Sequence, residues 1–177
     1  YPCVTMPGVS LMPAPASGED LVPERVMLRL VPLLKRYFDR VILDSPAGVG
    51  RGFRAAAAAA DCALIVCNSD PVCIRDASIV RRLLTELEVP QQRLVINRFN
   101  AEYFGSLSAG REDAGGLRDL DDVIDQSGVR LIGIVPEDRQ MTAAFQRGCV
   151  PADDLPGMTA LSRIAARMNG VSVPLSL

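Results

Sequence analysis

The chain has 177 residues, of which 49% are hydrophobic, so it is long enough to form one domain with a buried core. Histidine is absent, which excludes His-based acid–base catalysis and imidazole metal sites, and a net charge of -2 gives no general attraction to nucleic acid or anionic membranes. Five cysteines without a C-x-x-C pair argue against zinc and against a disulfide framework, and they indicate a reducing, cytoplasmic setting.

The first third of the chain predicts two strands and two helices. Residues 9–12 form a short apolar run that predicts a strand, and a linker rich in Pro, Ala, Ser and Gly follows. Pro23 is expected to open a helix that runs to Tyr37, because apolar residues recur there at helical spacing. The members of this stripe are Val26, Leu30, Leu33, Leu34 and Tyr37. A buried strand is expected at residues 40–44, and the alanine-rich residues 51–60 predict a helix.

The rest of the chain alternates strands with helices. Residues 62–67 are apolar without a break, which predicts a strand buried on both faces. Asp70 and Pro71 then offer a helix start. Further strands are expected at 94–96 and 130–135, and helices at 71–88, around 120–124, at 139–146 and at 158–168. Residues 100–118 predict a flexible surface loop. The alternation predicts an α/β fold with a mostly parallel sheet flanked by helices, in one domain over residues 1–177.

Polar residues follow three of the apolar runs. The run at 41–43 leads into Asp44 and then into a turn of small residues, Ser45, Pro46, Ala47 and Gly48. At the carboxyl edge of a parallel sheet, an Asp commonly holds a metal bound to nucleotide phosphates, although an Asp that only caps the next helix would look similar. Asn97 and Arg98 follow the second run, and Pro136, Glu137 and Asp138 follow the third. An Asn amide can donate and accept at a purine edge, and an Arg can stack on the ring.

These three motifs, in this order, resemble the MinD/ParA family of deviant P-loop ATPases, and most closely its MinD members; the resemblance runs from about residue 9 to about residue 170. It implies a P-loop NTPase fold of the SIMIBI type, with ATP and Mg²⁺ as cofactors of a complete, homodimeric protein. Asp44 would orient Mg²⁺ through water, and Ser45 to Gly48 would follow the γ-phosphate as a switch segment. Asn97, Arg98 and the loop of Pro136, Glu137 and Asp138 would surround adenine. Arg75 and Asp76 would lie on a dimer and partner surface, although an exposed charged helix face explains them equally well.

Two departures from the family pattern shape the functional expectation. A GKGGVGKT-like loop is absent, and Lys35, the one lysine of the chain, lies in a helical pattern instead. We therefore expect the C-terminal part of an ATPase, inactive alone. Residues 170–177 are uncharged and contain proline, whereas family members end in a basic amphipathic helix. Membrane contact is accordingly doubtful, and the expected location is the cytoplasm or the inner face of the cell membrane.

The resemblance implies a role in positioning the division septum together with regulator proteins. The net charge of -2 leads us to expect no specific nucleic-acid partner. Two alternatives stay open. One is a non-catalytic, P-loop-less module that binds a protein partner, and the other is a ParA-like or other MinD-type ATPase with a different cargo. A receiver or flavodoxin-like domain fits the alternating pattern but lacks its acid pair and strand-end lysine.

Overall fold

The structure, a computed structural model, describes residues 4–6, 8–13, 22–100 and 120–175. It comprises two compact units. The first unit is Tyr1–Asp61 with Leu87–Val89, and the second is Cys62–Glu86 with Pro90–Leu177. The predicted flexible loop at 100–118 lies, apart from residue 100, outside the described residues.

The first unit contains a hairpin and two helices. Strands β1 (Val4–Met6) and β2 (Val9–Leu11) pair antiparallel. Helix α1 (Glu24–Leu34) contacts α2 (Arg51–Ala58), and both helices were predicted. Pro23 is the N-cap residue of α1, as expected, and beyond the helix end the ammonium group of Lys35 forms an ion pair with Asp61 at 2.6 Å.

Two predictions for the first unit are wrong. Residues 40–44 form no strand, and the side chain of Ile42 is 89% exposed. An apolar run becomes a strand only where a neighbour completes its backbone hydrogen bonds, and within the described part of this unit the one ladder is β1 with β2. In α1 the buried residue is Val31, whereas Val26 and Leu33 of the predicted stripe are exposed, and Tyr37, also exposed, lies beyond the end of the helix at Leu34.

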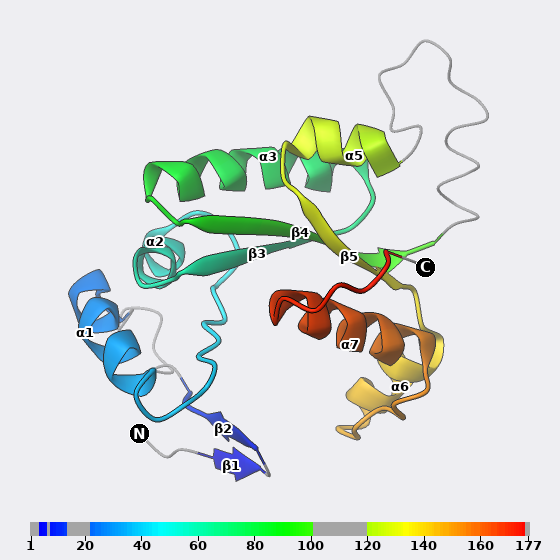
Figure 1. The fold of residues 1–177 in the computed structure, drawn as a ribbon, viewed down its shortest axis with the longest axis horizontal. Helices are drawn as coiled ribbons and strands as arrows, with labels where there is room; N and C mark the ends of the chain where they lie inside the picture. Colours follow the sequence, from blue (N-terminus) through cyan, green and yellow to red (C-terminus); the bar gives the residue numbers. More distant parts are fainter. Residues whose placement is uncertain (1–3, 7, 14–21, 101–119, 176–177) are drawn as a thin grey trace. The chain divides into compact units, whose positions relative to one another are not determined.

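The second unit is a parallel sheet with helices on both faces. The strand order is β3 (Cys62–Cys67), β4 (Gln91–Phe99), β5 (Leu131–Pro136). Helices α3 (Pro71–Glu86) and α5 (Leu120–Ser127) lie on one face, and α7 (Pro156–Met168), which follows α6 (Arg139–Gln146), packs on the other face against β5 (Figure 1). The parallel sheet and its helices were predicted and are confirmed. In the described part of the chain, no helix has the length and apolarity needed to cross a bilayer.

Strand β3 is less buried than its sequence predicted. Ile65 is buried, but Leu64 is 39% exposed and Val66 is 58% exposed, so burial on both faces is wrong. The reason is that β3 is an edge strand among the described strands, and an edge strand has fewer neighbours to cover it.

The pairing of β4 with β5 contains two register shifts. Leu94 pairs with Leu131 but Val95 pairs with Gly133, so β5 carries an extra residue, Ile132. Ile96 then pairs with Ile134 and Phe99 with Pro136, so β4 carries an extra residue in its turn. The second shift falls at Asn97 and Arg98, near the carboxyl end of the sheet. Bulges of this kind locally change the direction of side chains.

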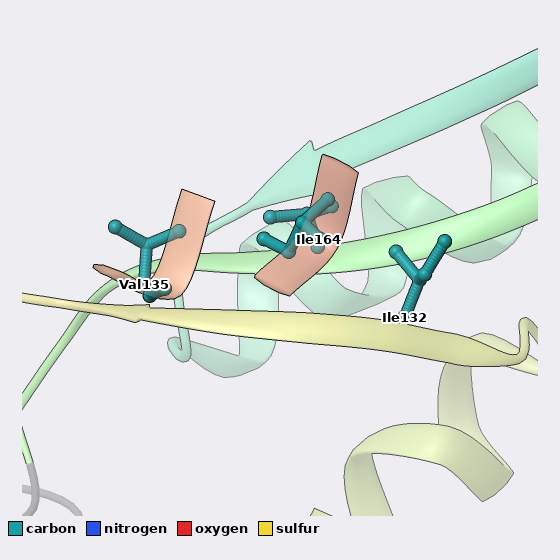
Figure 2. Close-up of a cluster of buried hydrophobic side chains, with 5 residues drawn as sticks. Ile132, Val135 and Ile164 are labelled. Atoms are coloured by element: carbon teal, nitrogen blue, oxygen red, sulfur yellow. The ribbon is translucent and has the colours of Figure 1, made fainter. Parts of the chain in front are cut away.

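A hydrophobic cluster holds α7 on the sheet. Its buried members are Val95, Ile132, Val135, Ala160 and Ile164, and Figure 2 shows Ile164 beside Ile132 and Val135. Gly133 permits the close approach, since a Cβ atom there would lie 2.2 Å from Cγ1 of Ile164. The helix is further tied to the strand by Arg167, whose Nη1 donates to the Ile132 carbonyl oxygen at 2.7 Å.

Candidate functional site

The carboxyl ends of β4 and β5 bring together the residues predicted to surround adenine. Nη2 of Arg98 lies 3.7 Å from Oε1 of Glu137, so an ion pair joins β4 to the residue that follows β5. The backbone N–H of Glu137 also donates to the carbonyl oxygen of Phe99 at 2.9 Å. Asn97 and Arg98 lie within β4 rather than after it, because the strand continues to Phe99. These five residues thus lie at one sheet edge, while their contact with adenine remains a prediction.

Arg98 has an unusual backbone conformation. Its φ is 54°, in the left-handed region that non-glycine residues rarely adopt. It coincides with the extra residue of β4, where a bulge can turn a side chain away from the regular alternation. The Arg98 side chain is consequently exposed at the strand end, where its guanidinium group meets Glu137.

Asp138 has a structural task that the sequence did not predict. It is the N-cap residue of α6, and its Oδ1 accepts from the N–H groups of Gln140 and Met141, both at 2.9 Å. Its Oδ2 accepts from the N–H of Gly157, in the first turn of α7, at 3.2 Å. The N–H groups of Met141, Gly157 and Gln140 hold the pKa of the Asp138 carboxyl below its ordinary value. Asp138 therefore ties two helix N-termini to the loop that follows β5, while its contact with a nucleotide remains a prediction.

The predicted metal and phosphate segment belongs to the first unit. Asp44 is exposed in a stretch without regular structure, and the hydroxyl of Ser45 donates to the carbonyl oxygen of Pro46 at 3.2 Å. Gly48 has a φ of 82°, which glycine adopts without strain. In the described residues, no three Asp, Glu, Cys or His side chains gather as a ready metal site. A single Asp44 carboxylate fits Mg²⁺ that takes its remaining ligands from phosphates and water.

The predicted partner surface lies on α3. Arg75 and Asp76 are exposed on this helix, on which Val72 is 69% exposed and Ile79 is 37% exposed. The hydroxyl of Ser78 donates to the carbonyl oxygen of Arg75 at 2.7 Å, within the helix. A role of Arg75 and Asp76 in dimer or partner contacts remains a prediction.

The start of α3 shows the predicted helix cap and two perturbed thiols. The thiol of Cys73 and the N–H groups of Cys73 and Val72 donate to the Asp70 carboxylate, which lowers the pKa of Asp70. The hydrogen bond to Asp70 raises the pKa of the Cys73 thiol. Burial, with smaller contributions from Cys73 and Asp70, raises the pKa of Cys67 to about 11. A thiol with such a pKa stays protonated at neutral pH, which suits a packing role for Cys67.

Two residues that support the site were missed in the sequence. The N–H of Gly157 donates to the Asp138 carboxylate, although the two residues lie 19 positions apart in the sequence. The guanidinium group of Arg167 joins α7 to β5 and also donates to the carbonyl oxygens of Val173 and Pro174. The helix start was visible in Pro156, a residue favoured in the first helical turn. Nothing local in the sequence indicates that the following N–H reaches the carboxylate of Asp138.

Known proteins are similar to this chain in sequence and in fold, although no family model matches it. The septum site-determining protein MinD of Synechocystis sp. is 32% identical over 174 residues, which cover 96% of this chain and 62% of the relative. The Bacillus subtilis protein of the same name is 31% identical over 172 residues, which cover 94% of this chain and 61% of that relative. A solved MinC:MinD cell division protein complex of Aquifex aeolicus matches with a TM-score of 0.77 at 29% identity, covering 89% of this chain and 63% of that chain. This chain thus spans about three fifths of the length of these curated relatives.

The parallel sheet, its flanking helices and its solved neighbours define an α/β protein with the P-loop NTPase fold. Within this class, the sequence similarity to MinD proteins extends over nearly the whole chain. The chain is similar in sequence and in fold to MinD proteins, and the resemblance to the MinD/ParA family is confirmed.

Proposed function

We propose that this chain is part of a MinD-like ATPase whose complete form binds ATP and Mg²⁺, dimerises, and hydrolyses ATP to help position the cell-division septum. The observation that carries the proposal is the meeting of Arg98 with Glu137 at the carboxyl edge of β4 and β5. Nucleotides bind at this edge in open α/β sheets. The similarity to curated MinD proteins supports the same assignment.

The carboxyl ends of β4 and β5 supply groups suited to a purine base. The Asn97 amide can donate to and accept from its polar edge, and the planar guanidinium group of Arg98 can stack on the ring. The loop of residues 136–138 is fixed by the hydrogen bond from Glu137 to Phe99 and by the cap that Asp138 forms. Backbone groups in this loop are therefore held in place before a ligand arrives.

Asp44 is assigned to the metal and phosphate end of the nucleotide. Bound Mg²⁺ would offset the negative charge that develops on the phosphates during hydrolysis. The carboxylate of Asp44 would orient that ion through water, and Gly48 would let the backbone approach the phosphates and rearrange. These roles follow from the family resemblance and from the chemistry of the side chains.

The first test is to read the coding DNA upstream of Tyr1 and to measure ATP binding by the product of the complete reading frame. A frame that contains a GKGGVGKT-like loop should give a protein that binds ATP with Mg²⁺, whereas the 177-residue chain alone should not. Asp44→Asn should abolish Mg²⁺-dependent hydrolysis, and Asp39→Asn, another exposed carboxylate of the first unit, is the matched control. A complete product that bound no nucleotide would refute the proposal.

A second candidate is a non-catalytic module that binds a protein, and the exposed face of α3 favours it. Val72 and Ile79 are exposed on the helix that also carries Arg75 and Asp76. Cell-division regulator proteins are the expected partners, and the cytoplasm, with the inner face of the membrane, is the expected location. This candidate predicts that the 177-residue chain is a stable protein that does not bind nucleotide and that binds a partner through α3. Aggregation of the chain produced alone, or capture unaffected by Arg75→Ala and Asp76→Ala together, would count against it.

A further inference from the structure

The Arg98 backbone combines two local irregularities that need a reason. Its left-handed φ of 54° is strained for a residue with a Cβ atom, and it falls on the extra residue of β4. Strain of this kind costs of the order of a few times the thermal energy and clusters at functional sites. A glycine would adopt the conformation at no such cost. The strained arginine indicates that the direction of its side chain has a use.

We propose that Glu137 is a positioning residue, which fixes the plane of the Arg98 guanidinium group so that its face is presented to a purine base. This inference rests on the proposed function and deepens it. Carboxylates engage a guanidinium group through the N–H donors at its edge, which leaves the planar faces free for stacking. The Arg98 Nη2 to Glu137 Oε1 distance of 3.7 Å is that of an ion pair between opposite charges on β4 and on the residue that follows β5.

The backbone of Glu137 is anchored on both sides. Its own N–H donates to Phe99 at 2.9 Å, which anchors it to the strand that carries Arg98. The next residue, Asp138, accepts three N–H groups from α6 and α7. The Glu137 backbone is therefore held between its own hydrogen bond to Phe99 and the N-cap that Asp138 forms, and its carboxylate stands on a shorter side chain than the guanidinium group of Arg98.

The expected effect is modest because the pair is not deeply buried. The Arg98 side chain is 66% exposed and that of Glu137 is 44% exposed. Ion pairs with such exposure contribute little free energy. Loss of one should therefore change an affinity that depends on it by about two- to fivefold. Isothermal titration calorimetry can measure a change of this size.

The experiment measures the affinity of the complete reading-frame product for ATP and for a ribose 5′-triphosphate that lacks the base. Glu137→Gln should weaken ATP binding by about two- to fivefold and leave binding of the base-free analogue unchanged. Because Glu137 acts through Arg98, Glu137→Gln should have no further effect in an Arg98→Ala background. Glu86→Ala, at an exposed position at the end of α3, is the matched control and should change neither affinity.

The outcomes separate the two proposals. If wild type binds no nucleotide, the proposed function falls and this inference falls with it. If wild type binds ATP and Glu137→Gln binds it equally well, the proposed function stands and the positioning role is overturned. A loss that persists in the Arg98→Ala background, or that extends to the base-free triphosphate, would show that Glu137 acts directly or through the fold, and it would also overturn the inference.

Discussion

The contact between Gly133 and Ile164 yields a stability prediction whose size can be worked out from the structure. In Gly133→Ala, the new Cβ atom would lie 2.2 Å from Cγ1 and 2.7 Å from Cδ1 of Ile164. Real Cβ atoms do not approach other atoms so closely, so α7 must move away from β5 or Ile164 must change its rotamer. Overpacking of a core typically costs about 1–3 kcal/mol. The closer clash is with Cγ1, an atom near the helix backbone, so we expect a value in the upper half of that range.

The alanine also has a small favourable effect, because a glycine in a strand is less stable than alanine by roughly 0.5–1 kcal/mol. The net destabilisation expected for Gly133→Ala is therefore about 1–2.5 kcal/mol. Urea unfolding of the 177-residue chain, followed by circular dichroism, would measure it as a lower midpoint with an unchanged slope.

The matched control is the same substitution in an Ile164→Ala background, where both clashing atoms are gone. Ile164→Ala alone should cost about 2–5 kcal/mol because it leaves a cavity in the cluster beside Ile132 and Val135. Adding Gly133→Ala to it should cost nothing or restore a few tenths of a kcal/mol, a coupling of about 1–3 kcal/mol. Equal costs of Gly133→Ala in both backgrounds would show that α7 does not press on β5 at this glycine.

The remaining predictions concern single groups. Arg98→Gly should be more stable than Arg98→Ala by roughly 0.5–1 kcal/mol in the free energy of unfolding, because glycine takes a φ of 54° without strain. Urea unfolding would show this as a higher midpoint for Arg98→Gly, and the reverse order would argue against the left-handed backbone. The hydrogen bonds of Asp138 lower its pKa, so their stabilisation is complete above the ordinary value of 3.8 and is lost as the pH falls through the lowered one. Unfolding free energies measured from pH 5 to pH 2.5 should thus fall more steeply for wild type than for Asp138→Asn, and parallel curves would refute the assignment. Because burial raises the pKa of Cys67 to about 11, an alkylating reagent at pH 8 should label the exposed Cys149 well before Cys67, as mass spectrometry of a partial reaction would show; equal labelling would contradict the burial.

The second unit could largely be predicted from the sequence because its signals are local. Apolar runs mark β3, β4 and β5, and Asp70 lies where α3 begins, with a carboxylate that accepts from the free N–H groups of Val72 and Cys73. The strand expected at 40–44 failed for a different reason. Its apolar residues satisfy the pattern, but a strand also needs a neighbour, and pairing is a property of the fold rather than of the run itself.

The site shows the same division between local and long-range information. Asn97, Arg98 and Glu137 could be selected because each is a polar residue beside the end of an apolar run. The ion pair and the left-handed backbone of Arg98 could not be predicted, since both depend on how β4 is aligned with β5. A bulge has no reliable signature in a single strand, because it is defined by what the partner strand lacks.

The two bulges of the β4–β5 pair offset each other. The extra residue of β5, Ile132, moves the alignment by one position, and the extra residue of β4 at Asn97 and Arg98 moves it back before Phe99 meets Pro136. Insertions and deletions in these strands should therefore be tolerated in pairs. Loss of either extra residue alone would shift the register of the two strands by one residue as far as the sheet edge, and it would separate Arg98 from Glu137. Loss of both would restore the alignment of the strand ends. The length of each strand thus constrains the length of the other, and homologous chains that lack one bulge should lack its counterpart.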